Sequence, residues 1–198
     1  MVAAALAFAS GSLTAALAFE LFAKENHESL WLAAAGLIAG AAVFTVIDAL
    51  LEQRWPREKA TGFALLAAVT LDGVPENVAL GVTLAADGSL ALLVAIFCSN
   101  LAESAGGAAE MREGGDSRLR VVLLWITVAA LLAAALVAGR LLGGTGGAEG
   151  FLLAFAGGAV LASLAATLMP EAYREGGPFV AFATAAGFLL SFLLAASE

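Results

Sequence analysis

Seven long apolar segments constrain this sequence more than any other feature. A helix that crosses a bilayer needs roughly 20 mostly apolar residues. Seven stretches of about that length follow one another, over residues 2–22, 30–51, 60–86, 89–109, 119–142, 150–170 and 179–196. The sequence therefore predicts an all-α fold, a polytopic membrane helix bundle that forms a single transmembrane domain over residues 1–198.

The composition supports this class of protein and excludes others. Apolar residues make up 62% of the chain and charged residues 13%, against roughly 45–50% and about 25% in soluble domains. A soluble fold of this size could not bury so much apolar surface, which argues against a conventional cytosolic enzyme or a nucleic-acid binder. The single Cys98 excludes a disulfide framework. No signal peptide is expected, because the first basic residue is Lys24.

The distribution of Lys and Arg predicts the orientation. Seven of the nine basic residues fall in the joints at 52–59, 110–120 and 173–178, which lie on one side of the predicted bundle, and only Lys24 and Arg140 fall on the other. Cytoplasmic loops carry the excess of Lys and Arg. We therefore expect a cell (inner or plasma) membrane protein with a cytoplasmic N-terminus and an extracellular or periplasmic C-terminus.

This orientation gives a direct labelling prediction. In a Cys98→Ala background, a membrane-impermeant thiol reagent should label Ser117→Cys from the cytoplasmic face and Gly146→Cys from the outer face. Labelling of both positions from the same face would contradict the predicted topology.

An internal repeat is predicted between the two ends of the chain. Residues 7–25 and 154–172, separated by 147 positions, are identical at eight of nineteen positions, although an Ala-rich composition alone could produce part of this match. The repeats would cover residues 1–52 and 148–198 around two central segments at 60–110. Because segments 2–22 and 150–170 would run in opposite directions, this is an inverted repeat, an architecture of secondary transporters. The counterpart of segment 119–142 would then precede Met1.

Two polar clusters lie near the middle of the third and fourth segments. Each places a Glu three or four residues after another polar side chain on one helix face: Asp72 before Glu76, and Ser99 and Asn100 before Glu103. A charge at mid-membrane costs about 2.5–3.5 kcal/mol on insertion scales. Carboxylate, amide and hydroxyl oxygens from two adjacent helices suit a divalent cation. A protonated structural network remains the alternative.

Both clusters resemble motifs of the ZIP (Zrt/Irt-like) metal transporters. Residues 72–77, Asp-Gly-Val-Pro-Glu-Asn, resemble the His-Asn-x-Pro-Glu-Gly motif of the family's fourth helix, and residues 99–103, Ser-Asn-Leu-Ala-Glu, resemble the metal-binding motif of its fifth helix. Residues 8–11, 155–158 and 169–171 are similar to the family's second and seventh helices. The resemblance covers the chain from the family's second helix onward and implies a ZIP-type protein without the first helix.

The resemblance implies an elevator-like transporter of divalent cations, with Zn²⁺ first and Mn²⁺, Fe²⁺ or Cd²⁺ as alternatives, and with a homodimer as a family expectation. The metal ligands carried over by position are Asp72, Glu76, Ser99, Asn100 and Glu103.

The chain departs from the family at several positions. Asp72 and Ser99 stand where the family has His or Gln, so the remaining ligands are oxygens, which suit Mn²⁺, Mg²⁺ or Ca²⁺ as well as Zn²⁺. Gly73 replaces a ligating Asn, and segment 119–142 has no carboxylate, so we expect one metal position instead of two. These losses leave open a degenerate, non-transporting protein that senses metal or serves as a scaffold.

Four further acids are candidates for a metal pathway. Glu20 lies near the predicted outer end of its segment, where a simple interfacial charge is the alternative to an entrance acid. Asp48, Glu110 and Glu171 lie near the cytoplasmic ends and could form an exit relay. An enzyme is not expected, because a single His cannot supply a His-Glu-x-x-His zinc helix and no Gly-x-Ser-x-Gly elbow is present. The predicted partners are a metal ion and the lipid bilayer, without nucleic acid.

Overall fold

The computed structural model describes residues 1–22, 30–55, 63–143 and 149–197. Within these ranges every regular element is helical, which confirms the all-α prediction. The elements are α1 (Val2–Ala16) with the π-helical turn η1 (Leu17–Phe22), α2 (Leu30–Arg54), α3 (Phe63–Thr83), α4 (Leu90–Glu113), α5 (Arg118–Gly143), the continuous rod α6 (Glu149–Ser163)–η3 (Leu164–Leu168)–α7 (Met169–Gly176), and α8 (Val180–Ala195).

Six of the described helical rods are long and apolar enough to cross a membrane, which by length and composition makes this a multi-pass membrane protein. The exception is α8, which has 16 residues and spans about 24 Å at 1.5 Å per residue. The helices differ in how deeply they are buried in the bundle. In the most apolar 18-residue window of α6–α7, 61% of the residues are buried, against 17% in that of α5, so α6–α7 is central and α5 is peripheral.

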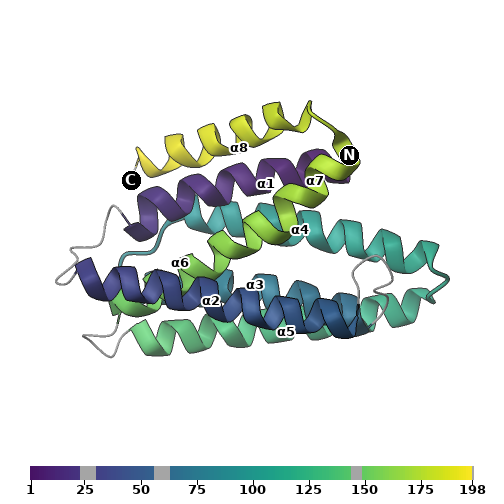
Figure 1. The fold of residues 1–198 in the computed structure, drawn as a ribbon, viewed down its shortest axis with the longest axis horizontal. Coiled ribbons are helices and arrows are strands. Elements are labelled where there is room, and N and C mark those ends of the chain that lie inside the picture. Colours follow the sequence, from purple (N-terminus) through teal and green to yellow (C-terminus); the bar gives the residue numbers. More distant parts are fainter. Residues whose placement is uncertain (23–29, 56–62, 144–148, 198) are drawn as a thin grey trace.

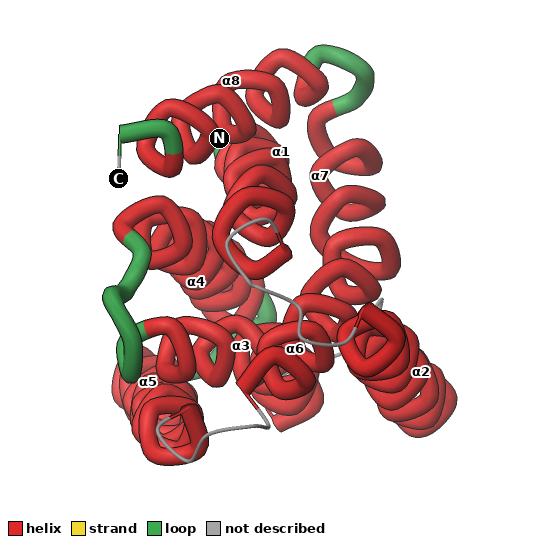
Figure 2. The backbone as a smooth tube through the Cα atoms, turned by 90° about the vertical axis from the view of Figure 1, so that its left-hand side faces the viewer, coloured by secondary structure: helices red, strands yellow, loops and turns green. Residues whose placement is uncertain are grey.

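The helices form parallel pairs that lie side by side (Figures 1 and 2). Helix α1 packs against α8, α2 against α6 and α3 against α5. Glycine makes these contacts close: a Cβ atom at Gly40 of α2 would lie 1.9 Å from the carbonyl oxygen of Phe155, and one at Gly81 of α3 would lie 2.0 Å from that of Leu136. Small residues that let backbones approach are the usual means of packing helices in lipid.

The α6–η3–α7 rod crosses the bundle obliquely between α1 and the α2–α3 layer (Figure 1). The sequence predicted an end at residue 170, but the helix continues to Gly176. Pro170 lies in the first turn of α7, just after the π-helical turn. Inside a continuous helical rod, the missing N–H of a proline leaves one carbonyl of the preceding turn without its helical partner, and the π-helical turn η3 lies at that turn. The continued helix places Glu171 and its neighbours near the C-terminal end of α4.

Candidate metal site between α3 and α4

The polar clusters of the third and fourth segments meet where α3 and α4 pack. Ser99 Oγ lies 3.2 Å from Glu76 Oε1 and 3.1 Å from Glu103 Oε1, so one hydroxyl joins carboxyl groups from both helices. Glu76 is only 2% exposed and Ser99 is fully buried. Three of the five predicted ligands are therefore in direct contact inside the protein.

Three carboxyl and amide oxygens of α3 and α4 have no hydrogen-bond partner among the described residues. They are Glu76 Oε2, Glu103 Oε2 and Asn100 Oδ1, each shielded from solvent. Buried polar atoms are nearly always paired, so each unpaired group needs an explanation. All three are acceptors, and a bound cation is a ligand that would satisfy acceptors together.

The two contacts of the Ser99 hydroxyl also bear on the protonation of the Glu76 and Glu103 carboxyl groups. A hydroxyl carries one hydrogen and donates a full bond to one acceptor at a time, and ionised carboxylates can only accept. Two ionised groups at Glu76 and Glu103 therefore compete for the single Ser99 proton. A proton on either carboxyl group, or a cation between the two, removes this competition.

Asp72 of α3 also contacts α6. Its Oδ1 atom accepts a hydrogen bond of 2.9 Å from Ser163 Oγ, and Ser163 in turn contacts the hydroxyl of Thr167 at 3.3 Å. Among the described residues, the carboxyl groups of Asp72, Glu76 and Glu103 do not gather as closely as the acidic group at the end of α4 described below. Ser163 and Thr167 were not predicted, because only the packing of α6 against α3 brings them to Asp72.

The residues around Gly73 leave little room beside this contact. A Cβ atom at Gly73 would lie 2.8 Å from Leu132 Cδ2 of α5 and 3.4 Å from Asn100 Oδ1. An apolar side chain thus occupies the space on the α5 side of Asn100. The Asn77 amide donates a 2.8 Å bond to the Gly73 carbonyl, so this side chain bonds the backbone of its own helix.

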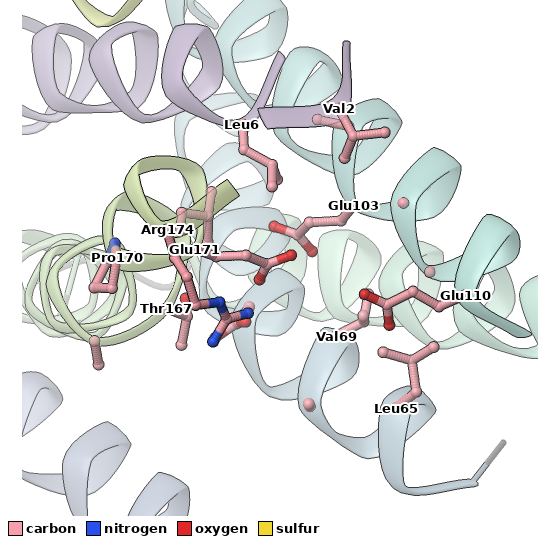
Figure 3. Close-up of a pocket in the computed structure, with 17 residues that line it drawn as sticks. Val2, Leu6, Leu65, Val69, Glu103, Glu110, Thr167, Pro170, Glu171 and Arg174 are labelled. Atoms are coloured by element: carbon pink, nitrogen blue, oxygen red, sulfur yellow. The ribbon is translucent and has the colours of Figure 1, made fainter. Parts of the chain in front are cut away.

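A cavity of about 180 Å³ leads from the predicted site toward one end of the bundle. Asp72 and Glu103 line it, together with Glu110, Glu171 and Arg174. Figure 3 shows the carboxyl groups of Glu103, Glu110 and Glu171 turned toward the same space, with the Arg174 side chain beside them. Two of the predicted pathway acids, Glu110 and Glu171, therefore line the same cavity as the predicted ligands Asp72 and Glu103.

A second acidic group lies beside this cavity, and two of its three members line it. Oxygen atoms of Glu110, Glu171 and Glu175 lie within 4.8 Å of one another. The sequence analysis missed Glu175, although its spacing of four residues from Glu171 places both on one face of α7. It also missed Arg174, which lines the same cavity and supplies a positive charge among these acids.

The remaining candidates lie apart from the cavity or outside the described residues. Asp48 is half-buried on α2 and is not among the residues that line the cavity. Glu20 belongs to η1, but its side chain lies outside the described part, as does all of His27. Cys98 is half-buried and does not line the cavity either.

No family model matches the chain, and a search of curated proteins finds no relative. The resemblance to ZIP transporters therefore rests on the motifs, and the function must be argued from the residues and their geometry.

Proposed function

We propose that the chain is a ZIP-like membrane transporter of divalent metal cations, with the cation held between α3 and α4. The observation that carries the proposal is the pair of unpartnered, buried carboxyl oxygens, Glu76 Oε2 and Glu103 Oε2, on two carboxyl groups that meet at Ser99. A structural network would pair these atoms with donors, whereas a metal site needs them free. Zn²⁺ is the cargo that the resemblance implies.

The helix contacts support the inverted repeat that transport by alternating access would use. Close glycine contacts occur in two sets of two. In each set, the second contact follows from the first when one residue number is raised by 147 and the other is lowered by 147. The π-helical turns η1 and η3 begin at Leu17 and Leu164, separated by the same 147 positions. The two sets are Gly11 with Thr184 and Gly158 with Leu37, and Gly40 with Phe155 and Gly187 with Phe8.

The cavity supports a route for the cation on one side of the site. It runs from Asp72 and Glu103 to Glu110 and Glu171 at the end where α4 finishes. Under the predicted orientation, this is the cytoplasmic end, so the acids of the cavity would receive a cation that leaves the site.

A second candidate function is a metal sensor or scaffold that binds a cation without transporting it. The position of Leu132 against Gly73 favours it, because an apolar side chain occupies the space where the family places a second metal ligand. Metal uptake into proteoliposomes separates the two. Uptake by the native chain that is lost in Glu103→Gln supports transport, whereas binding without uptake supports the sensor or scaffold.

Metal affinity should fall at mildly acidic pH. Carboxyl ligands must be deprotonated to bind, and the Glu76–Ser99–Glu103 contact is well suited to hold a proton when no cation is present. For each proton displaced, we expect the affinity to drop about tenfold per pH unit once the carboxyl groups are protonated. Calorimetry between pH 7.5 and 5 measures this slope, and a constant affinity over that range would contradict it.

A further inference from the structure

The donor atoms that surround the proposed metal position are all oxygens. Glu76 and Glu103 supply carboxylates and Ser99 supplies a hydroxyl. On the cavity side, Asp72 adds a carboxylate, and behind it lie the hydroxyl groups of Ser163 and Thr167.

No nitrogen or sulfur ligand from the described residues reaches this position. Cys98 precedes Ser99, so its side chain points about 100° away from that of Ser99 around the helix, and it does not line the cavity. Of the methionines, Met1 is fully exposed, Met111 is buried away from the cavity lining and Met169 faces a different hollow between α7 and α8.

The number of oxygens is as informative as their type. Glu76 and Glu103 offer two oxygens each and Ser99 offers one, so two helices present up to five donors, and the carboxyl group of Asp72 lies on the cavity side. Mg²⁺ demands near-octahedral oxygen coordination and Ca²⁺ takes six to eight oxygens, whereas Zn²⁺ sites are almost always built from four ligands that include His or Cys. Carboxylate, carbonyl and water ligands suit Mg²⁺, Ca²⁺ and Mn²⁺.

Resting on the metal site proposed above, we propose that this site takes hard, oxygen-preferring divalent cations of the Mn²⁺ and Mg²⁺ class and gives Zn²⁺ no marked advantage. For a given set of ligands, affinity generally rises from Mn²⁺ toward Zn²⁺. Without a nitrogen or sulfur ligand, the site lacks the donors for which Zn²⁺ has its strongest preference.

The test compares affinities for Mn²⁺, Mg²⁺ and Zn²⁺ in the purified full chain by calorimetry. We expect the native chain to bind all three, with Zn²⁺ no more than about tenfold tighter than Mn²⁺. Ser99→Cys replaces the central oxygen by sulfur at nearly constant volume and should raise the Zn²⁺-to-Mn²⁺ affinity ratio at least tenfold. Asp72→His, on the roomier cavity side, is a second variant that should shift the ratio in the same direction.

The matched control is Ser104→Cys on the same helix, where the native hydroxyl bonds the Leu101 carbonyl. This control should leave the ratio unchanged. A native preference for Zn²⁺ well above tenfold, or unchanged ratios in both Ser99→Cys and Asp72→His, would overturn the inference while leaving the metal site in place. Failure of all three cations to bind the native chain would overturn the metal site itself.

Discussion

Removal of both central carboxylates, in the double variant Glu76→Ala/Glu103→Ala, should abolish the stabilisation of the protein by divalent cations. A ligand that binds only the folded state at about 100 times its Kd adds about 2.7 kcal/mol of stability. The double variant loses both charged ligands, and the part of the chain that the structure describes offers no His nearby to replace them. A thermal-shift titration measures the effect.

Graded variants test the same site more finely. Glu76→Gln and Glu103→Gln keep the volume of each side chain but remove its charge, so each should weaken binding strongly without a packing defect. Ser99→Ala should weaken binding less, because a neutral hydroxyl is a weak ligand beside carboxylates. Ser104→Ala serves as the control, and metal stabilisation that persists in the double variant would place the cation elsewhere.

The second large effect is expected from a single glycine in the α2–α6 contact. Gly40→Leu should destabilise the folded protein by at least about 3 kcal/mol, in the upper range for overpacked cores. A Cβ atom at this position would overlap the Phe155 carbonyl oxygen at 1.9 Å, and a backbone atom cannot move aside as a flexible side chain can. Thermal unfolding in detergent, followed by circular dichroism, measures the loss.

The matched control for this variant is Ala42→Leu. Ala42 lies two residues farther along α2 on an exposed face, so the added leucine meets lipid or detergent instead of α6. It should leave the unfolding temperature nearly unchanged. Equal stability of Gly40→Leu and Ala42→Leu would show that the two helices do not pack as the structure places them.

Much of the fold is predictable from the sequence because hydrophobic length is a local property. The apolar runs alone predict the helices and most of their bounds, and a membrane leaves few alternatives to helices. The sequence does not reveal that α6 continues through Pro170, since that depends on the preceding π-helical turn.

The candidate site is predictable only in part, because its contacts join helices that are far apart in the sequence. Glu76, Ser99 and Glu103 could be chosen because their spacing along each helix places them on one face. Their contact with each other, the turn of Asp72 toward Ser163 and the approach of Leu132 to Gly73 all depend on how different helices pack. Such contacts between segments far apart in the chain leave no local pattern in a single sequence.

The central claim is that one divalent cation is held between the carboxyl groups of Glu76 and Glu103. Crystals grown with Mn²⁺ and measured near its absorption edge test it most directly, because anomalous scattering locates the metal without reference to the protein. The account predicts a peak about 2.0–2.6 Å from oxygens of both glutamates, in the range of hard-cation bonds. A peak found only at Glu110, Glu171 and Glu175, or none in a crystal saturated with Mn²⁺, would contradict it.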